Sequence, residues 1–229
     1  MKRPTVLITG SSRGLGEALA LAFARDGWSV IIHGRHRGRL ARVKKAVQAH
    51  GSSCTAVQGD LTAEKTIEKL AAVARQADLD ILVNNAAAYM HRAFLWMEPA
   101  EILALIETNL VAPLILTRRL STIFFAKADG MIININSLAG KRPGDDESIY
   151  CATKHGLRGF SSSLQFDATR HGIRMLDVYL GAMQTAMTHE RPHAERFIDP
   201  NEAADLIVRL TQSYRTMNIR EVEIGRRNY

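Results

Sequence analysis

The segment that most constrains the fold lies at the N-terminus of the chain. Thr5–Ile8 has the apolar pattern of a short buried strand, and residues 17–25 place apolar side chains on one side of a predicted helix. Between them, residues 9–16 read T-G-S-S-R-G-L-G. Glycines let the backbone approach a ligand, and free N–H groups at a helix N-terminus attract anions. We therefore predict a phosphate-binding turn here, with a plain tight turn as the alternative.

The same alternation of strand and helix continues through the sequence. Short apolar runs predict strands over residues 5–8, 27–34, 53–58, 79–83, 131–135, 175–180 and 221–224. Helical patterns cover residues 17–25, 35–50, 63–76, 99–126, 150–170 and 200–213. Strands that alternate with helices in this way pair in parallel through right-handed crossovers. The pattern predicts an α/β fold of the doubly wound, Rossmann-like kind, with about seven mostly parallel strands and helices on both faces.

The 229 residues contain no internal repeat, low-complexity segment or linker, so we expect a single domain over residues 1–229. Ligands of doubly wound folds bind beyond the carboxyl ends of the strands. Small and polar residues fall at those ends: Gly10, Asp60, Asn84, Ser137 and Gly181.

Charge and cysteine content narrow the classes of function. The formal net charge is +7, and the densest basic run covers residues 35–45. That run has no interleaved aromatic residues and no recognition-helix or zinc-finger pattern, so we expect no nucleic-acid partner. Cys54 and Cys151 form neither a metal-binding spacing nor a disulfide framework, which favours the reducing cytoplasm. No apolar run approaches the roughly 20 residues of a membrane helix, so we expect no membrane partner either.

Tyr150 and Lys154 are the candidate reactive pair. They lie four residues apart in the predicted helix 150–170, and therefore on one helix face. A free tyrosine has a pKa of about 10. A cation about 4 Å away favours the phenolate by about 4 kcal/mol, or roughly three pKa units. We therefore expect Lys154 to lower the pKa of Tyr150 toward neutrality, with a packed tyrosine beside a solvated lysine as the alternative.

Residues 189–193 read H-E-R-P-H and match a zinc-protease signature. That site needs both histidines on one face of a continuous helix, and Pro192 disfavours helix at Arg191. We therefore interpret His189 and His193 as surface-loop residues, without a metal. We interpret the acidic residues 145–147 as a solvated turn, or as residues that border the bound substrate and repel anionic substrates.

The chain resembles the short-chain dehydrogenase/reductase family over nearly its whole length. Its motif residues match those of the family in order: T-G-x-x-x-G-x-G at Thr9, Gly10, Gly14 and Gly16, the acid after the third strand at Asp60, N-N-A-G at Asn84, Asn85, Ala86 and Ala87, the helix asparagine at Asn109, the serine at Ser137, Y-x-x-x-K at Tyr150 and Lys154, and P-G-x-x-x-T at Leu180, Gly181 and Thr185. Ala87 stands where the family has glycine, and Leu180 where it has proline. The segment after Thr185 is short, so we expect an open substrate pocket.

The resemblance implies hydride transfer between a nicotinamide cofactor and a small carbonyl or alcohol. In the family's terms, Tyr150 is the general acid and base, and Ser137 holds the substrate oxygen. Lys154 contacts the nicotinamide ribose, and Asn109 holds the water that reprotonates Lys154. The implied cofactor-binding residues are Gly10, Ser12, Arg13, Gly14, Leu15, Gly16, Arg35, Asp60, Leu61, Asn85, Ala86, Ala87, Tyr150, Lys154, Gly181, Met183 and Thr185.

The predicted cofactor is NADP(H) rather than NAD(H). An NAD site usually offers an acid after the second strand, and that acid would repel the ribose phosphate of NADP. Here the strand is followed by Gly34 and Arg35, with no acid nearby. Arg35 supplies a fork of donors, and Arg13 in the glycine-rich turn reaches the same region.

Two rival functions remain open. A non-catalytic NADP(H)-binding regulator would keep the fold without turnover, but the complete set Asn109, Ser137, Tyr150 and Lys154 favours an enzyme. A 3-oxoacyl-[acyl carrier protein] reductase suits the net positive charge, although residues 128–130 lack a basic group that would help there. As in the family, we expect a homodimer or homotetramer formed through helices 99–126 and 150–170.

Overall fold

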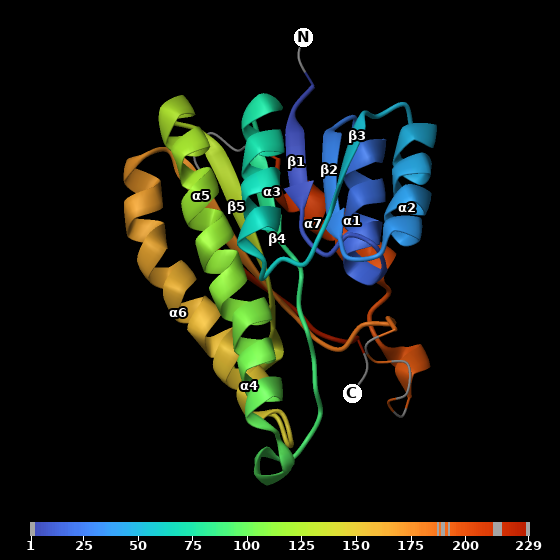
Figure 1. The fold of residues 1–229 in the computed structure, drawn as a ribbon, viewed down its shortest axis with the longest axis vertical. Coiled ribbons are helices and arrows are strands. Elements are labelled where there is room, and N and C mark those ends of the chain that lie inside the picture. The colour runs from blue at the N-terminus through green and yellow to red at the C-terminus, as the bar shows by residue number, and fades with distance from the viewer. Residues whose placement is uncertain (1–2, 187, 189–190, 192, 213–216, 228–229) are drawn as a thin grey trace.

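The structure is a computed structural model that describes residues 3–186, 188, 191, 193–212 and 217–227. These residues form a seven-stranded sheet in the order β3-β2-β1-β4-β5-β6-β7, with every neighbouring pair parallel (Figure 1). The strands are β1 (Thr5–Ile8), β2 (Ser29–Gly34), β3 (Cys54–Gln58), β4 (Ile81–Asn84), β5 (Gly130–Ser137), β6 (Ile173–Leu180) and β7 (Glu221–Ile224). The predicted doubly wound fold is confirmed, and the sheet is parallel throughout rather than mostly parallel.

Helices cover both faces of the sheet. One face carries α1 (Gly14–Arg25), α2 (Arg37–Ala49) and α7 (Pro200–Leu210). The other carries α3 (Glu64–Gln76), α4 (Pro99–Ile106), α5 (Ala112–Lys127) and α6 (Ser148–Arg170). Short helical turns are η1 (Phe94–Trp96), η2 (Glu107–Val111), η3 (Leu138–Gly140) and η4 (Ala194–Arg196).

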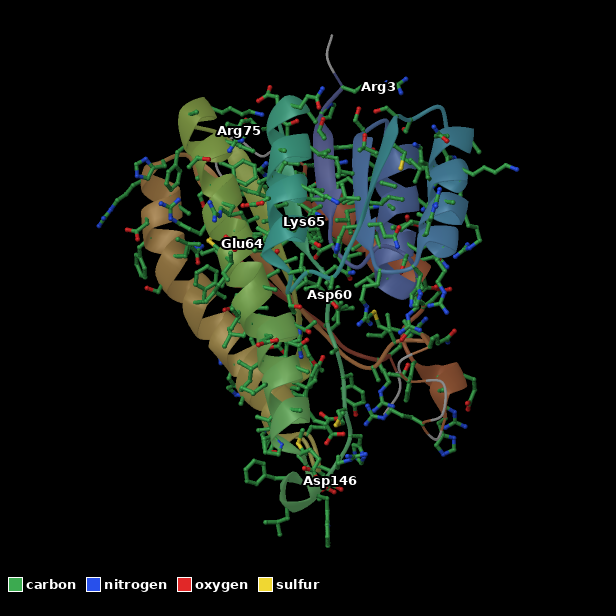
Figure 2. All side chains as sticks on the ribbon, in the orientation of Figure 1. Arg3, Asp60, Glu64, Lys65, Arg75 and Asp146 are labelled. Carbon is green, nitrogen blue, oxygen red and sulfur yellow. The ribbon has the colours of Figure 1, made fainter. Side chains whose placement is uncertain are left out.

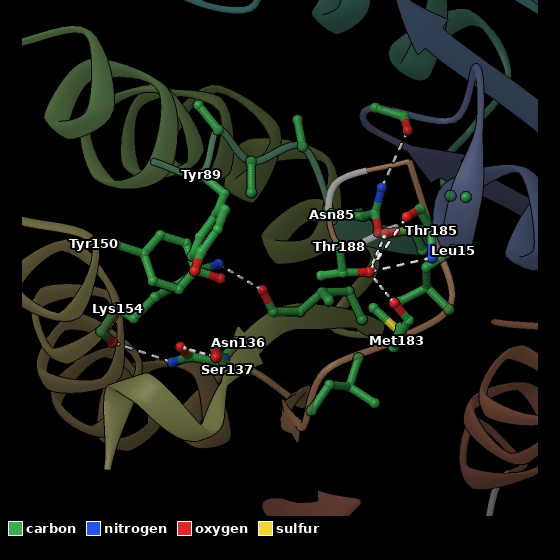
Figure 3. A pocket seen from close by; sticks show the side chains of 18 of the residues that line it. Leu15, Asn85, Tyr89, Asn136, Ser137, Tyr150, Lys154, Met183, Thr185 and Thr188 are labelled. Atoms are coloured by element: carbon green, nitrogen blue, oxygen red, sulfur yellow. Dashed lines mark hydrogen bonds between the residues drawn. The ribbon is translucent and has the colours of Figure 1, made fainter. Parts of the chain in front are cut away.

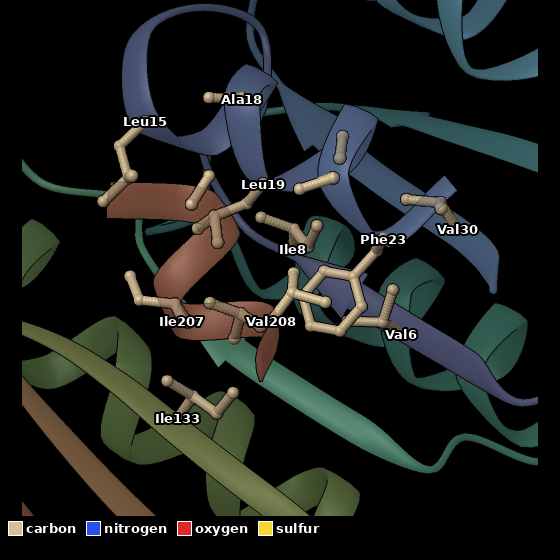
Figure 4. Packing of buried hydrophobic residues seen from close by; sticks show 14 of the residues in the cluster. Val6, Ile8, Leu15, Ala18, Leu19, Phe23, Val30, Ile133, Ile207 and Val208 are labelled. Carbon is tan, nitrogen blue, oxygen red and sulfur yellow. The ribbon is translucent and has the colours of Figure 1, made fainter. Parts of the chain in front are cut away.

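The core consists of two apolar layers, one on each side of the sheet. β1 contributes to both, because successive side chains of a strand point to opposite faces. Val6 and Ile8 pack beneath Phe23 of α1 and Ile207 of α7 (Figure 4), while Leu7 packs into the layer under α3 and α5. All five side chains are fully buried. This double burial explains why the strand is a continuous apolar run.

The predicted helix 99–126 is the element that differs most from expectation. It consists of α4, the π-helical turn η2 and α5. Pro113, near the start of α5, lacks the N–H that would bond the carbonyl of Asn109 in a regular α-helix. The wider π turn at η2 accommodates this missing bond and contains Asn109.

The joined helix Pro99–Lys127 also corrects the expectation that no apolar run approaches a membrane span. Its 29 residues have a mean hydropathy of 1.6 in the most apolar window, of which 33% is buried, so length and composition alone would let it cross a membrane. In the fold, α5 lies against β5 and α3. Some apolar residues of the joined helix face the core and others face solvent. Leu116 and Phe124 are fully buried, whereas Leu103 and Ile115 are 58% and 44% exposed.

Candidate active site

A cavity of about 930 Å³ lies at the carboxyl edge of the sheet. It is lined by the glycine-rich turn, the ends of β2, β4 and β5, the first turns of α6, and the segment after β6. Every residue predicted for the catalytic and cofactor sites lines this cavity, with the exception of Asn109. Segments far apart in the sequence therefore meet around one space, as expected for the switch point of a doubly wound sheet.

The glycine-rich turn has a conformation that lets a ligand come close to its backbone. Gly10 has a φ of +65°, which favours glycine. A Cβ at Gly16 would lie 2.4 Å from the Gly10 carbonyl oxygen and 2.5 Å from Asn85 Nδ2. Asn85 Nδ2 donates to the carbonyls of Thr9, at 2.8 Å, and Gly10, at 3.2 Å, and so fixes the turn to the end of β4. Arg13, the N-cap residue of α1, makes no capping bond with its side chain, which leaves the first N–H groups of the helix for a ligand.

His33 links two segments of the cavity wall, and no pattern in the sequence singled it out. It lies at the end of β2 and is 2% exposed. The Gly10 N–H donates to His33 Nδ1 at 3.4 Å, and His33 Nε2 lies 3.1 Å from the Gly59 carbonyl oxygen. Burial lowers the pKa of His33 to about 4, so the ring is neutral at physiological pH. The imidazole thus joins the glycine-rich turn to the loop that carries Asp60.

Tyr150, Ser137 and Lys154 converge on the opposite end of the cavity (Figure 3). Ser137 ends β5, and its hydroxyl lies close enough to the Tyr150 phenol to lower that phenol's pKa. Lys154 is 3% exposed, and its Nζ donates to the Ile135 carbonyl at 3.0 Å. Asn136 Nδ2 donates to the Lys154 carbonyl at 3.2 Å and holds α6 against β5. A hydroxyl, a phenol and an amine are thereby fixed at one place.

The pKa shifts of this group contradict the expectation that Lys154 lowers the pKa of Tyr150. Burial raises the pKa of Tyr150 to about 12; the Ser137 hydrogen bond opposes this shift and the Glu147 charge adds to it. Burial lowers the pKa of Lys154 to about 8. Loss of water disfavours both charged forms. Lys154 Nζ donates to the Ile135 carbonyl and lies 5.8 Å from the Tyr150 ring centre.

Asn109 lies behind the cavity wall. Its Nδ2 donates to the Ala88 carbonyl at 2.8 Å, and its Oδ1 accepts from the Ala88 N–H at 2.7 Å. Nδ2 also approaches Thr153 Oγ1 of α6 at 3.3 Å. Asn109 is 1% exposed and ties the chain after β4 to the helix of Tyr150. The Asn109 side chain therefore contacts the backbone of Ala88 and the hydroxyl of Thr153.

The end of the cavity near β2 and the glycine-rich turn contains the two predicted arginines. The side chain of Arg35 is 70% exposed, and its Nη1 lies 3.8 Å from Asp60 Oδ2. Asp60 Oδ1 accepts from the N–H and hydroxyl of Thr62 at 3.0 and 2.9 Å. A Cβ at Gly34 would lie 3.1 Å from Ser12 Cβ, so a bulkier residue would push the glycine-rich turn away.

The wall next to Tyr150 contains a charged cluster. Tyr89 packs edge-to-face on Tyr150 with ring centres 5.1 Å apart, and its hydroxyl donates to Glu147 Oε1 at 2.5 Å. Arg191 lies 3.8 Å from Glu147 and 5.9 Å from the Tyr89 ring centre. Of the residues 145–147, Asp145 and Asp146 are exposed as interpreted, whereas Glu147 lines the cavity. Glu147 is therefore part of the cavity wall rather than of a solvated turn.

The H-E-x-x-H motif falls largely outside the described residues, since His189, Glu190 and Pro192 are not among them. Within the part of the chain that the structure describes, no three His, Cys, Asp or Glu residues are grouped as a metal site.

Comparison with known proteins agrees with this geometry. The family described as short chain dehydrogenase matches residues 4–196. The chain is 32% identical to the ketoacyl reductase HetN of Nostoc over 222 residues, which cover 93% of this chain and 76% of that protein. It is 30% identical to a 3-oxoacyl-[acyl-carrier-protein] reductase of Synechocystis, with 88% and 86% covered. A metagenomic short-chain oxidoreductase solved in complex with NADP superposes with a TM-score of 0.86 at 31% identity, over 97% of this chain and 96% of that one.

Proposed function

This chain belongs to the short-chain dehydrogenase family and is an oxidoreductase of that family, and on this basis we propose that it transfers hydride between NADP(H) and a small carbonyl or alcohol, with Tyr150 as general acid and base. One observation carries the proposal. Tyr150, Ser137 and Lys154 line the same cavity as the glycine-rich turn, so a cofactor held by its phosphates at one end has its reactive end beside the phenol.

The residues fit a dinucleotide. The cradle at Gly10 and Gly16 has no room for a side chain, and the N-terminus of α1 offers uncapped N–H groups to a pyrophosphate. When bound, the nicotinamide supplies or accepts the hydride. Tyr150 donates its proton to the carbonyl oxygen, and Ser137 hydrogen-bonds and orients that oxygen. Lys154, with a pKa lowered to about 8, passes a proton back to the phenol.

The protonation state of Tyr150 suits the proton-donating step of carbonyl reduction. With the pKa raised to about 12, the phenol keeps its proton at neutral pH and is ready to donate it. Alcohol oxidation needs the phenolate, which becomes more abundant only at higher pH.

Arg35 and Arg13 support NADP(H) as the preferred cofactor. Both line the cavity, and the exposed side chain of Arg35 forms a long ion pair with Asp60. Exposed ion pairs contribute little, so the guanidinium remains available to a ribose phosphate.

A 3-oxoacyl thioester is the second candidate substrate, because two relatives covering most of this chain are named as ketoacyl reductases.

We propose that the chain is one domain that acts in the cytoplasm as a homodimer or homotetramer. Support for assembly comes from apolar side chains on α4, α5 and α6: Leu103, Ile115 and Phe166 are 58%, 44% and 72% exposed.

A panel of carbonyl compounds, followed by NADPH oxidation, tests the proposal. Tyr150→Phe should lower kcat about 10² to 10⁴-fold, because the ring still packs but the proton is lost. Its NADPH affinity, measured by fluorescence titration, should stay within about twofold and serves as the folding control. Retention of more than about a tenth of wild-type kcat would contradict the assigned acid.

A further inference from the structure

One acid belongs to the wall of the cavity beside Tyr150. Glu147 is the N-cap residue of α6, and its side chain is only 12% exposed. The hydroxyl of Tyr89 donates to it at 2.5 Å, and the Tyr89 ring packs edge-to-face on Tyr150. Its side chain makes no capping hydrogen bond to α6, and the bond from the Tyr89 hydroxyl holds this carboxylate in the wall.

The charge of Glu147 is only partly balanced. Arg191 lies 3.8 Å from the carboxylate, which is beyond hydrogen-bonding distance, and the arginine side chain is 43% exposed. Glu147 contributes to the raised pKa of Tyr150, so its field reaches the phenol. Among the described residues, the other polar groups near Tyr150 are the Tyr89 phenol, the hydroxyl of Ser137, the thiol of Cys151 and the amine of Lys154. Arg142 also lines the cavity and forms an ion pair with Glu223 at 3.3 Å.

We propose that Glu147 determines substrate specificity by charge: it admits carbonyls whose neighbouring group is a neutral or cationic hydrogen-bond donor, and it disfavours oxo acids whose carboxylate lies next to the reacting carbonyl. The proposal rests on the proposed function, because it assumes that the substrate carbonyl binds at Tyr150 and Ser137. A carboxylate one or two carbons from that oxygen would face Glu147 across the cavity.

The expected effect follows from the repulsion between two carboxylates. At about 7 Å and an effective dielectric of about 20, this repulsion corresponds to roughly fiftyfold in affinity. Arg191 and solvent offset part of it, so we expect about tenfold discrimination.

Acetoacetate and acetoacetamide provide a matched pair of probes, since they share the carbonyl and the size and differ in charge. Their dissociation constants with the NADP⁺-loaded protein can be measured by ligand-observed NMR, and their kcat/KM values with NADPH. Glu147→Gln keeps the side-chain size and an acceptor for the Tyr89 hydroxyl. Asp146→Asn is the control, because Asp146 lies exposed at the outer tip of the molecule (Figure 2) and asparagine tolerates its φ of +50°.

The wild type should bind the amide about tenfold more tightly than the acid. Glu147→Gln should bring acetoacetate to within about twofold of the amide, and Asp146→Asn should leave the ratio unchanged. Equal changes for both probes, or an unchanged ratio in Glu147→Gln, would overturn the proposal. The binding ratio does not require turnover, so a chain that bound the probes but oxidised no NADPH would refute the proposed reaction and still decide the role of Glu147.

Discussion

Replacement of Asp177 by asparagine should make the protein more stable above neutral pH. Asp177 lies on β6, is 4% exposed, and faces Asn134 of β5 across the sheet. Its Oδ1 has no hydrogen-bond partner among the described residues. Burial raises the pKa of this carboxyl from 3.8 to about 6, with hydrogen bonds from Ser161 and Asn134 opposing the shift. The fold therefore prefers the protonated acid.

The sign and size of the effect follow from this shift. A carboxyl whose folded pKa is raised stabilises the fold only while it keeps its proton. Stability is lost as pH rises from the unfolded pKa of 3.8 through the folded pKa of about 6. At about 1.4 kcal/mol for each pKa unit, the total loss is about 3 kcal/mol, of which about 1.4 kcal/mol falls between about pH 5 and about pH 8.

Urea unfolding of the wild type and Asp177→Asn near these two pH values measures the stability that is lost when Asp177 ionises. The difference in unfolding free energy between the two proteins should grow by about 1.4 kcal/mol in favour of the variant toward the higher pH. The contributions of other titrating groups are the same in both proteins, so they cancel when the two proteins are compared at the two pH values. Exposed Asp129→Asn is the control and should show no growth. A difference that is constant with pH would refute the argument that Asp177 is buried with its proton.

Three further predictions concern the cofactor and assembly. Arg35→Ala should weaken NADPH binding roughly ten- to hundredfold and NADH binding little in fluorescence titrations; equal losses would refute the NADP(H) assignment. His33→Leu removes both ring hydrogen bonds and should weaken NADPH binding about tenfold while kcat at saturating NADPH persists; unchanged affinity would exclude the bridging role. Light scattering should give two or four times the chain mass of 25.4 kDa, and a value near 25.4 kDa would rule out the oligomer.

Much of the fold could be read from the sequence, because its signals are local. The alternation of apolar runs with helical patterns predicted all seven strands, and strand β7 has the predicted bounds, Glu221–Ile224. The glycine-rich turn was predicted from Gly10, Gly14 and Gly16, because three glycines between a strand and a helix form a local pattern. The Tyr150 and Lys154 pair follows in the same way from helix periodicity.

Tertiary structure decided the properties that depend on distant partners. Asn109 bonds Ala88 and Thr153, and His33 joins Gly10 to Gly59; the strand register sets such pairs, and no local pattern encodes them.

The pKa of Tyr150 is the clearest example of a property that only the tertiary structure decided. From the sequence, only the spacing to Lys154 was visible, and it predicted a lowered pKa. In the fold, burial dominates, Lys154 turns to the backbone of β5, and Glu147 comes into the cavity wall. The sequence determined which groups are present and on which element. Their charge states depend on the water that packing removes and on the charges that it brings near, and only the folded chain determines both.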